Sequence, residues 1–443
     1  MPDDELALFR ARVHEKVSKP RRYLLVPQFI SNSMTSSNSQ LFQPIKVGDI
    51  KLNHRVVLAP LTRFRASADH VPLPLVKEYY SQRASEPGTL LITEGTAIHP
   101  RAGGYTHIPG IWSDAQVVAW KEIVDAIHAK GSYVYLQLWA LGRAAEPAQF
   151  HAEDSSYPYV SASDLPMSDR PMAPRPLTVE EIKDYVQYYA DAAKNAVHKA
   201  GFDGVEVHGA NGYLIEQFLK ESSNRRTDQY GGSPENQARF ALEVVDAVVK
   251  AVGPRKTGLR LSPWNTWQET GVKDPIPTYT YLVSELKKAH PTLAYIHVID
   301  PRIDNAVEIE DVGDRSNEFI REIWTNGPGG NDTEDGRRLI SAGNFDLASG
   351  TQLADTTGDL IAYGRRFIAN PDLPYRLKDN IPLTPYDRST FYIPGSLDSK
   401  GYIRLPVRSK KLSSNRQTFH EDLEERVAKL DTWIRLGPLT VLR

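Results

Sequence analysis

The stretch Thr178–Gly209, TVEEIKDYVQYYADAAKNAVHKAGFDGVEVHG, contains the unit that decides the fold. Its first part predicts a helix over Thr178–Ala200, because Thr178 and Glu181 have the spacing of a capping box. Its last part predicts a buried strand over Gly204–Gly209, since a short apolar run is bounded there by glycines. Alternation of helix and strand is the pattern of a parallel α/β sheet.

Eight short strands of this kind recur along the chain between longer stretches with helical periodicity. Their predicted ranges are Arg55–Pro60, Gly88–Gly95, Ser132–Trp139, Gly204–Gly209, Thr257–Pro263, Leu293–Asp300, Arg338–Asn344 and Gly358–Phe367. A further helix is predicted over Ser233–Val252, with Ser233 as N-cap and Pro234 at the first helical position. Eight strand–helix units close into a (β/α)8 barrel, whereas a doubly wound sheet usually has about six strands. The sequence therefore predicts an α/β protein with a (β/α)8 TIM barrel.

The barrel is expected to span residues 41–406 as one domain. Residues 140–177, after the third strand, contain six prolines and no sustained periodicity, so they predict a long rim loop. Residues 1–40 form an N-terminal extension with a Ser-rich, linker-like end. Residues 407–443 form a C-terminal extension, in which Glu421–Leu436 predicts an amphipathic helix.

Composition removes several kinds of chemistry. The 443 residues include 53 Lys+Arg, 55 Asp+Glu and no cysteine, which gives a formal charge of −2. Without cysteine there can be no disulfide, Cys-ligated zinc, iron–sulfur cluster or thiolate nucleophile. The near-neutral balance offers no basic field for nucleic acid or an anionic membrane, so a small molecule is the expected partner. No stretch is apolar enough for a membrane span or a signal peptide, and a cytoplasmic location is expected.

Polar residues follow the fourth predicted strand, where the active sites of barrels lie. His208 ends this strand, and Asn211 and Tyr213 follow closely. A lone histidine after an apolar strand is more often a core residue, but histidine and asparagine can both donate to one substrate oxygen. A tyrosine hydroxyl can supply a proton nearby. The twelve histidines include no His-x-His pair and no His-Glu-x-x-His, so no metal site is expected.

Glycine-containing turns end the last two predicted strands, at Gly343-Asn344 and Gly364-Arg365. Backbone N–H groups in such turns can close on a phosphate, and an adjacent arginine can neutralise it. An ordinary turn explains each pair alone, and their joint placement favours phosphate. There is no Gly-x-Gly-x-x-Gly and no Walker A sequence, so a nicotinamide cofactor would not be held on a Rossmann unit.

The order and spacing of several motifs resemble the Old Yellow Enzymes, flavin-dependent ene-reductases on a (β/α)8 barrel. The motifs are Leu-Ala-Pro-Leu-Thr62-Arg-Phe-Arg, Ile-Thr-Glu-Gly95, Gln137-Leu-Trp139, His208-Gly-Ala-Asn211-Gly-Tyr213-Leu, Asn224-Arg-Arg-Thr-Asp-Gln-Tyr-Gly-Gly-Ser233, Arg260-Leu-Ser-Pro, Ala-Gly343-Asn344, Tyr-Gly364-Arg365 and Asn370-Pro-Asp-Leu. The resemblance runs from about residue 41 to 406 and is to the fungal type. It implies bound FMN and an NADPH dehydrogenase or ene-reductase that reduces activated C=C bonds.

The resemblance also implies a role for each cofactor-binding residue. Thr62 would hydrogen-bond the flavin carbonyl near N5, while Pro60 and Gly95 would lie beside the ring edge. Gln137 would read the pyrimidine part of the ring, and Arg260 would stand beside N1, where negative charge develops on reduction. The ribityl-phosphate cradle would be formed by Gly343, Asn344, Gly364 and Arg365.

For the substrate, the resemblance implies that His208 and Asn211 grip the carbonyl oxygen of an enone or enal. Hydride would pass from flavin N5 to the β-carbon, and Tyr213 would protonate the α-carbon. NADPH and substrate would use the same cleft in turn, which gives ping-pong kinetics. Aromatic walls and substrate contacts would come from Tyr105, Trp139 and Tyr392, with Trp264 and Trp267 as further candidates.

Two alternatives remain open. A dedicated reductase or isomerase of secondary metabolism, for example in an alkaloid pathway, would use the same residues; Tyr213 favours net reduction, because phenylalanine at this position turns some relatives toward isomerisation. A non-catalytic flavin-binding barrel is disfavoured, since a binder needs no acid above the ring. The oligomeric state is expected to be a monomer or a homodimer. Within the family, the lack of cysteine excludes the iron–sulfur branch and the branch with cysteine at position 62.

Overall fold

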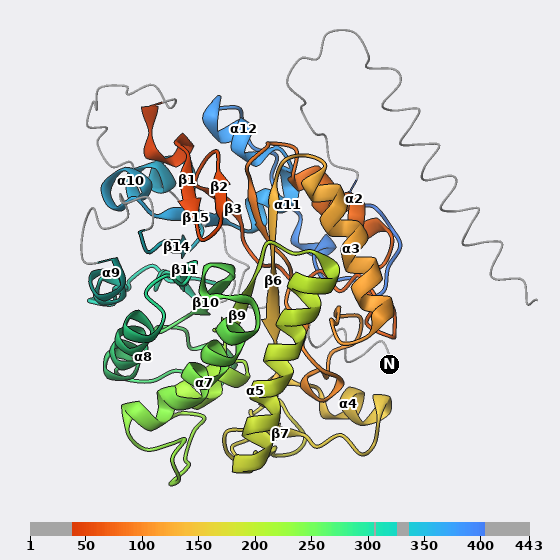
Figure 1. Cartoon of the computed structure of the whole chain (residues 1–443), viewed down its shortest axis with the longest axis vertical. Coiled ribbons are helices and arrows are strands. Elements are labelled where there is room, and N and C mark those ends of the chain that lie inside the picture. Colours follow the sequence, from red (N-terminus) through yellow and green to blue (C-terminus); the bar gives the residue numbers. More distant parts are fainter. Residues whose placement is uncertain (1–37, 305–306, 326–335, 404–443) are drawn as a thin grey trace, which may run out of the picture. The chain divides into compact units, whose positions relative to one another are not determined.

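The computed structural model describes residues 38–304, 307–325 and 336–403, and within them eight parallel strands form a closed barrel (Figure 1). Neighbouring strands around the ring follow chain order, and the last strand pairs with the first. The strands are β3 (Val56–Leu58), β4 (Leu90–Ile92), β6 (Tyr133–Trp139), β9 (Gly204–Gly209), β10 (Thr257–Leu261), β11 (Tyr295–Ile299), β14 (Leu339–Ala342) and β15 (Leu360–Tyr363). All eight predicted strands and the (β/α)8 barrel are confirmed.

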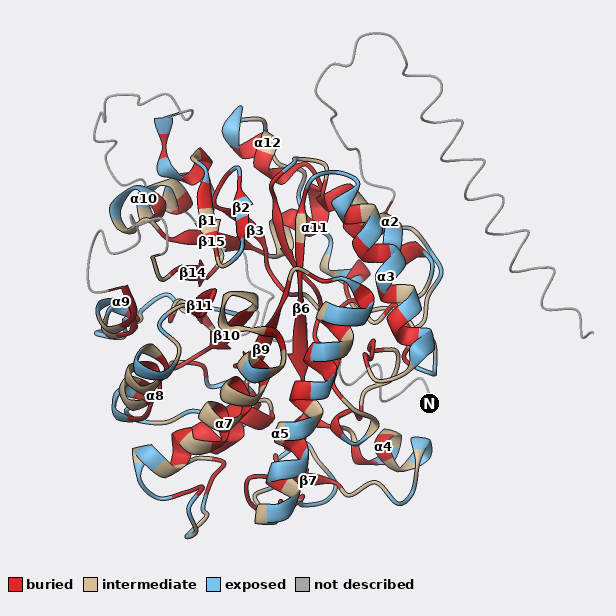
Figure 2. Cartoon of the chain, viewed as in Figure 1, coloured by how far each residue is buried: buried red, intermediate tan, exposed pale blue. Residues whose placement is uncertain are grey.

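Helices follow the strands and cover the outside of the barrel (Figure 1). They are α2 (Leu75–Arg83), α3 (Asp114–His128), α5 (Val179–Lys194), α7 (Pro234–Val252), α8 (Ile276–Ala289), α9 (Glu318–Thr325), α10 (Leu347–Thr357), α11 (Arg365–Ala369) and α12 (Leu373–Lys378). Figure 2 shows buried strands and helices with one exposed face, which is the burial pattern of amphipathic helices on a barrel.

The capping signals in the sequence predicted the helix starts correctly. Thr178 and Glu181 form the expected capping box of α5, which is followed by a π-helical turn, η5 (Asn195–Ala200). Ser233 accepts a hydrogen bond from the backbone N–H of Asn236 and so caps α7.

Side chains fill the barrel interior at its N-terminal end. Tyr135 on β6 and Tyr295 on β11 lie there, and two glycines make room for their rings. A Cβ atom added to Gly204 would lie 2.5 Å from the ring of Tyr135, and one added to Gly258 would lie 2.4 Å from that of Tyr295. The hairpin β1 (Ile45–Val47)–β2 (Ile50–Leu52) packs on this same apolar cluster. The N-terminal end of the barrel is therefore closed by a packed core.

Residues 140–177, predicted as a long rim loop, follow β6 and contain several short elements. The segment contains η4 (Gly142–Ala144), α4 (Pro147–Glu153), β7 (Val160–Ser161) and β8 (Arg175–Pro176), and β7 pairs with β8 in parallel. These elements are too short for a periodic pattern to show in the sequence.

The other short elements lie before, between and after the barrel strands. They are η2 (Gln40–Phe42), β5 (Thr96–Ala97), η3 (Pro100–Ala102), α6 (Leu214–Leu219), η6 (Pro254–Lys256), η7 (Trp267–Glu269), β12 (Ile303–Asp304), β13 (Val307–Glu308) and η8 (Arg388–Thr390). The predictions for residues 1–40 and 407–443, including the helix at Glu421–Leu436, lie outside the described residues, apart from positions 38–40. In the described ranges, none of the helices has the length and apolar character that crossing a bilayer would need.

Candidate active site

Four buried polar side chains from adjacent strands form a group inside the barrel, which we call the strand cluster: Gln137 on β6, Glu206 on β9, Arg260 on β10 and His297 on β11. In the sheet register, Gln137 lies beside Glu206, and Arg260 lies beside both His297 and His208. The sequence analysis identified Gln137 and Arg260 but missed Glu206 and His297. Their signal was a single polar residue between apolar neighbours, in Val-Glu-Val and Ile-His-Val.

Glu206 is the centre of the strand cluster. Its carboxylate accepts hydrogen bonds from Nε2 of Gln137 at 2.7 Å and from Nδ1 of His297 at 2.8 Å. Burial acts to raise the pKa of Glu206, but His297 and Arg260 outweigh it and leave that pKa below its ordinary value. Burial lowers the pKa of Arg260, yet a guanidinium stays protonated in proteins. Nε of Arg260 has no hydrogen-bond partner among the described residues.

His208 is a neutral hydrogen-bond donor. Burial lowers its pKa well below the usual range, and the charge of Arg260 lowers it further. Its Nδ1 accepts a hydrogen bond from the backbone N–H of Ala210 at 3.3 Å. Because a neutral imidazole carries one proton, that proton must then be on Nε2. Nε2–H of His208 is therefore the group that can bind an oxygen atom of a ligand.

Aromatic rings surround His208. The ring of Trp139 stacks on it at 6.3 Å between centroids, and the ring of Tyr213 meets it edge-on at 5.1 Å. Trp139 and Tyr213 also contact each other at 4.7 Å, and Tyr105 lies 5.9 Å from Trp139. A Cβ atom added to Gly95 would lie 2.6 Å from Trp139, so only glycine allows this tryptophan its place. The structure thus brings together four of the residues predicted at the substrate end, His208, Trp139, Tyr213 and Tyr105.

The aromatic wall continues through Phe64, which the sequence analysis did not single out. Its ring lies 6.3 Å from Tyr105 and 6.1 Å from Tyr392, so Phe64 connects the predicted wall residues. The two tryptophans of the loop after β10 differ from this wall: Trp264 donates its indole N–H to the carbonyl of Ser316, and the Trp267 side chain is 37% exposed.

Tyr213 is a partly buried phenol. Burial raises its pKa, and hydrogen bonding with Gln268 and Tyr105 opposes the rise without cancelling it. A phenol whose pKa lies above the ordinary value of about 10 is protonated at neutral pH. Tyr213 therefore carries a proton beside His208.

The loop after β3 carries Pro60 and Thr62, and a hydrogen bond to the Glu94 side chain holds it in place. Pro60 is buried and Thr62 is half-buried. The Glu94 carboxylate accepts the backbone N–H of Arg63 at 3.0 Å, and burial raises the pKa of Glu94 to about 7. Glu94 follows β4 and directly precedes Gly95. Its side chain therefore holds the loop that follows the neighbouring strand β3.

The predicted phosphate residues lie on adjacent strand ends, because β14 pairs with β15. Gly343 and Asn344 follow β14, Asn344 with a φ of 56°, and Gly364 and Arg365 follow β15. Both polar side chains approach one carboxylate: Asn344 donates Nδ2 to Oε1 of Glu308, and Nη2 of Arg365 lies 3.7 Å from the same oxygen. The side chains of this turn pair are thus arranged around an anionic group.

A second arginine, missed by the sequence analysis, supports this turn pair. Arg366 donates Nη1 to Oδ1 of Asn344 at 2.8 Å and to the carbonyl of Phe345 at 2.7 Å. It therefore fixes the left-handed conformation of Asn344. The sequence signal was the second arginine of Gly-Arg-Arg.

Comparison with known proteins identifies the family of this chain. The model of the NADH:flavin oxidoreductase / NADH oxidase family matches residues 40–384. The chain is 49% identical over 368 residues to the chanoclavine-I aldehyde reductase fgaOx3 of Penicillium roqueforti, covering 82% of this chain and 95% of that protein. It is 45% identical over 392 residues to "Probable inactive reductase easA" of Epichloe festucae var. lolii, covering 86% and 98%. The crystal structure of Old Yellow Enzyme from Pichia sp. AKU4542 is similar, with a TM-score of 0.75, 38% identity, and coverage of 86% and 97%.

Proposed function

The chain belongs to the NADH:flavin oxidoreductase / NADH oxidase family, as an Old Yellow Enzyme of the fungal type, and we propose that it reduces the C=C bond of α,β-unsaturated aldehydes and ketones. It is an oxidoreductase that uses FMN and NAD(P)H. We take NADPH as the reductant, and FMN, when bound, supplies hydride transfer between NADPH and the alkene.

The residues at the open end of the barrel fit FMN. The buried Nε of Arg260 has no partner among the described residues, and an acceptor on the flavin ring would satisfy it. Gln137 donates one amide N–H to Glu206, which orients its carboxamide for the polar edge of the ring. Pro60, Thr62 and Gly95 would line the ring on the side of β3 and β4. The phosphate would take the place of the Glu308 carboxylate beside Gly343, Asn344, Gly364 and Arg365.

The neutral donor His208 carries the proposal. Its Nδ1 is occupied by the N–H of Ala210, so Nε2–H can hold the carbonyl oxygen of a substrate. Asn211 follows on the same strand end and offers a carboxamide N–H to the same oxygen. Two donors on that oxygen withdraw electrons from the alkene and make its β-carbon electrophilic.

Tyr213 completes the reaction. The hydride adds to the β-carbon, and the phenol gives its proton to the α-carbon, so that the alkene gains H⁻ and H⁺ while NADPH becomes NADP⁺. The raised pKa keeps the phenol protonated until that step, and solvent restores the proton afterwards. Trp139, Tyr105 and Tyr392 would enclose the substrate, and nicotinamide and substrate would occupy the cleft in turn.

A dedicated role in secondary metabolism is a second candidate function. A relative of 49% identity bears the name of an aldehyde reductase, and one of 45% identity is named as inactive. A single unsaturated aldehyde as substrate would agree with the first name. Tyr213 favours reduction over isomerisation, because isomerisation needs no net proton delivery from this phenol.

Spectroscopy of the purified, FMN-loaded protein tests the proposal. Anaerobic NADPH should bleach the flavin absorbance, and 2-cyclohexenone or cinnamaldehyde should restore it. Protein that shows no flavin absorbance after FMN is added would contradict the assignment of the site. Bleaching that no enone or enal reverses would support a non-catalytic or narrowly dedicated barrel instead.

The Tyr213→Phe variant tests the proton donor. Bleaching by NADPH should proceed at the wild-type rate, whereas reoxidation by cyclohexenone should slow by about 10²-fold or more, the usual contribution of a general acid. A variant that loses both half-reactions equally would rule out the proton-donor role.

A further inference from the structure

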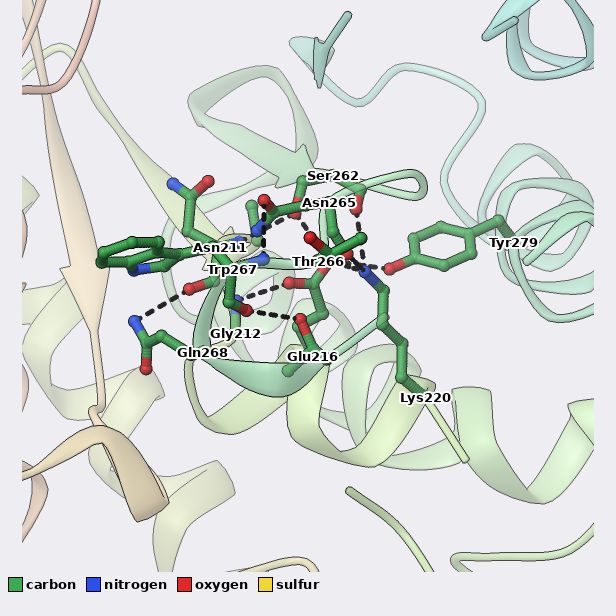
Figure 3. A network of polar contacts seen from close by, with 12 residues as sticks. Asn211, Gly212, Glu216, Lys220, Ser262, Asn265, Thr266, Trp267, Gln268 and Tyr279 are labelled. Carbon is green, nitrogen blue, oxygen red and sulfur yellow. Dashed lines mark hydrogen bonds and ion pairs between the residues drawn. The ribbon is translucent and has the colours of Figure 1, made fainter. Parts of the chain in front are cut away.

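A buried ion pair lies directly behind the turn that carries Asn211 (Figure 3). Glu216 and Lys220 lie four residues apart at α6, and their charged atoms are 3.2 Å apart. Both side chains are 0% exposed. With Ser262 and Tyr279 they form what we call the helix cluster, which has no part in the proposed chemistry.

The helix cluster is fully hydrogen-bonded. Nζ of Lys220 also donates to the carbonyls of Ser262 at 3.1 Å and Asn265 at 2.8 Å. The hydroxyl of Tyr279 donates to Oε1 of Glu216 at 2.9 Å. Burying two charges costs several kcal/mol per ion unless such contacts offset the loss of water, and apolar side chains would often do as well for stability. Stability alone is therefore a weak reason for this pair.

The N–H groups of the turn indicate another role. Asn211 and Gly212 both have left-handed backbone angles, with φ of 57° and 76°. Gly212 N–H donates to Oε2 of Glu216 at 2.5 Å. Asn211 N–H donates to Oγ of Ser262 at 2.8 Å, and this hydroxyl donates to Oε1 of Glu216 at 2.6 Å. The Gly212 N–H thus binds the Glu216 carboxylate directly, and the Asn211 N–H is connected to it through the Ser262 hydroxyl.

The carbonyl groups of the turn are fixed as well. The carbonyl of Asn211 accepts a hydrogen bond from Nε2 of Gln268 at 3.0 Å. The carbonyl of Gly212 accepts one from Nε2 of Gln217 at 2.8 Å. A left-handed conformation of asparagine is costly and persists when its surroundings determine it. Figure 3 shows the Asn211 carboxamide pointing away from Glu216, while its backbone faces the cluster.

We propose that Glu216 is a positioning residue for Asn211: its carboxylate holds the 211–212 turn and so sets where the Asn211 carboxamide meets the substrate oxygen. This rests on the proposed function of Asn211. Lys220 and Tyr279 keep the carboxylate oriented, and the Ser262 hydroxyl connects it to the Asn211 N–H. Bound geometry matters because a misplacement of about 1 Å can cost about 10²-fold in rate.

The test is a double-mutant cycle between the ion pair and Asn211. Replacing Glu216→Met together with Lys220→Met removes both charges at similar volume, so the FMN-loaded protein should still fold. We expect kcat/KM for cyclohexenone to fall by about tenfold or more. In an Asn211→Ala background the same double change should cost less than about twofold, because the group that it positions is already absent. Loss factors that multiply would refute the proposal.

Two further variants keep the result independent of folding. Glu216→Gln with Lys220→Met retains an acceptor for the Gly212 N–H and should recover most of the rate. Ser262→Ala removes the hydroxyl that connects the Asn211 N–H to Glu216. Its effect on kcat/KM should likewise disappear in the Asn211→Ala background. Affinity of the oxidised protein for 4-chlorophenol, read from the flavin spectrum, should fall in parallel with kcat/KM. Unchanged affinity in both Ser262→Ala and the ion-pair variant would overturn the positioning role.

A matched control is the pair Asp372 and Arg376 on α12, which is likewise buried and spaced i, i+4. This helix follows β15, which lies across the ring from β9. Asp372→Asn with Arg376→Met should change stability without coupling to Asn211→Ala, and equal coupling would contradict a specific role of Glu216. If wild-type protein does not reduce enones, the proposed function fails; if it does and the cycle shows no coupling, only this inference fails.

Discussion

The strand cluster and the helix cluster are both buried groups of a carboxylate, a cation and polar partners, and they differ in how completely they are hydrogen-bonded. In the helix cluster, both carboxylate oxygens of Glu216 and the Nζ of Lys220 have hydrogen-bond or ion-pair partners. In the strand cluster, Nε of Arg260 and Nε2 of His297 are buried without a partner among the described residues.

This difference separates a binding site from its support. An unsatisfied buried donor costs about 1–3 kcal/mol, and a ligand that supplies the missing partner removes that cost. In the proposed function, the flavin ring would complete the strand cluster. The helix cluster is complete because its task is to hold backbone, and any freedom there would reach Asn211.

Lys220→Met should have the largest effect on stability. It leaves the Glu216 carboxylate buried without its cation, which costs about 3–5 kcal/mol. Urea denaturation of the FMN-loaded variant should show this loss in the free energy of unfolding. A loss below about 1 kcal/mol would mean that the helix cluster can reorganise and is not the rigid support described above.

Arg260→Met should cost less in the apoprotein, roughly 1–3 kcal/mol, because His297 still donates to Glu206. Its main effect should be on the cofactor. Added FMN should raise the denaturation midpoint of wild-type apoprotein, since a ligand of the native state stabilises it, and should raise that of the variant much less. Equal FMN stabilisation of both proteins would show that the free donor of Arg260 is not a flavin contact.

The contrast between the clusters also marks what the sequence could predict. His208, Gln137 and Arg260 could be proposed from the sequence, because strand boundaries follow from apolar runs between glycines and prolines, and barrels place their sites toward the strand ends. Glu206 was missed, because strands with both faces buried do not reveal which residues face inward. The same limit applies to His297.

The helix cluster could not be predicted from the sequence, for a different reason. Glu216 and Lys220 have the i, i+4 spacing that usually marks an exposed pair on a helix. Their burial depends on Ser262 and Tyr279, which come from the next strand–helix unit, β10 and α8, and are brought near by the pairing of β9 with β10. The short elements within residues 140–177 were likewise set by tertiary contacts, since their sequences carry no period.

Acidification should act on the strand cluster, through His297, and on the neighbouring His208. Burial lowers the pKa values of His208 and His297, so below pH 6.5 the unfolded chain binds protons that the folded chain does not. Stability present above pH 6.5 is therefore lost as pH falls toward the folded pKa values, by up to about 1.4 kcal/mol per pH unit for each group. His297→Gln should make the dependence between pH 6.5 and 5 shallower by up to that amount. An unchanged slope in urea denaturation would mean that His297 is charged in the native state.

Tyr279→Phe should have the smallest effect on stability. It measures what one hydrogen bond contributes within the fully hydrogen-bonded helix cluster. Loss of the hydrogen bond from the Tyr279 hydroxyl to Glu216 should cost about 1 kcal/mol, because the carboxylate keeps its contacts with Lys220, Ser262 and Gly212. Tyr189→Phe is the matched control: this hydroxyl is equally buried but has no hydrogen-bond partner among the described residues, so its removal should be neutral or slightly stabilising. Thermal denaturation of the two variants compares the same atom lost from a complete and an incomplete environment. Equal costs would show that satisfaction of hydrogen bonds does not distinguish buried polar groups in this barrel.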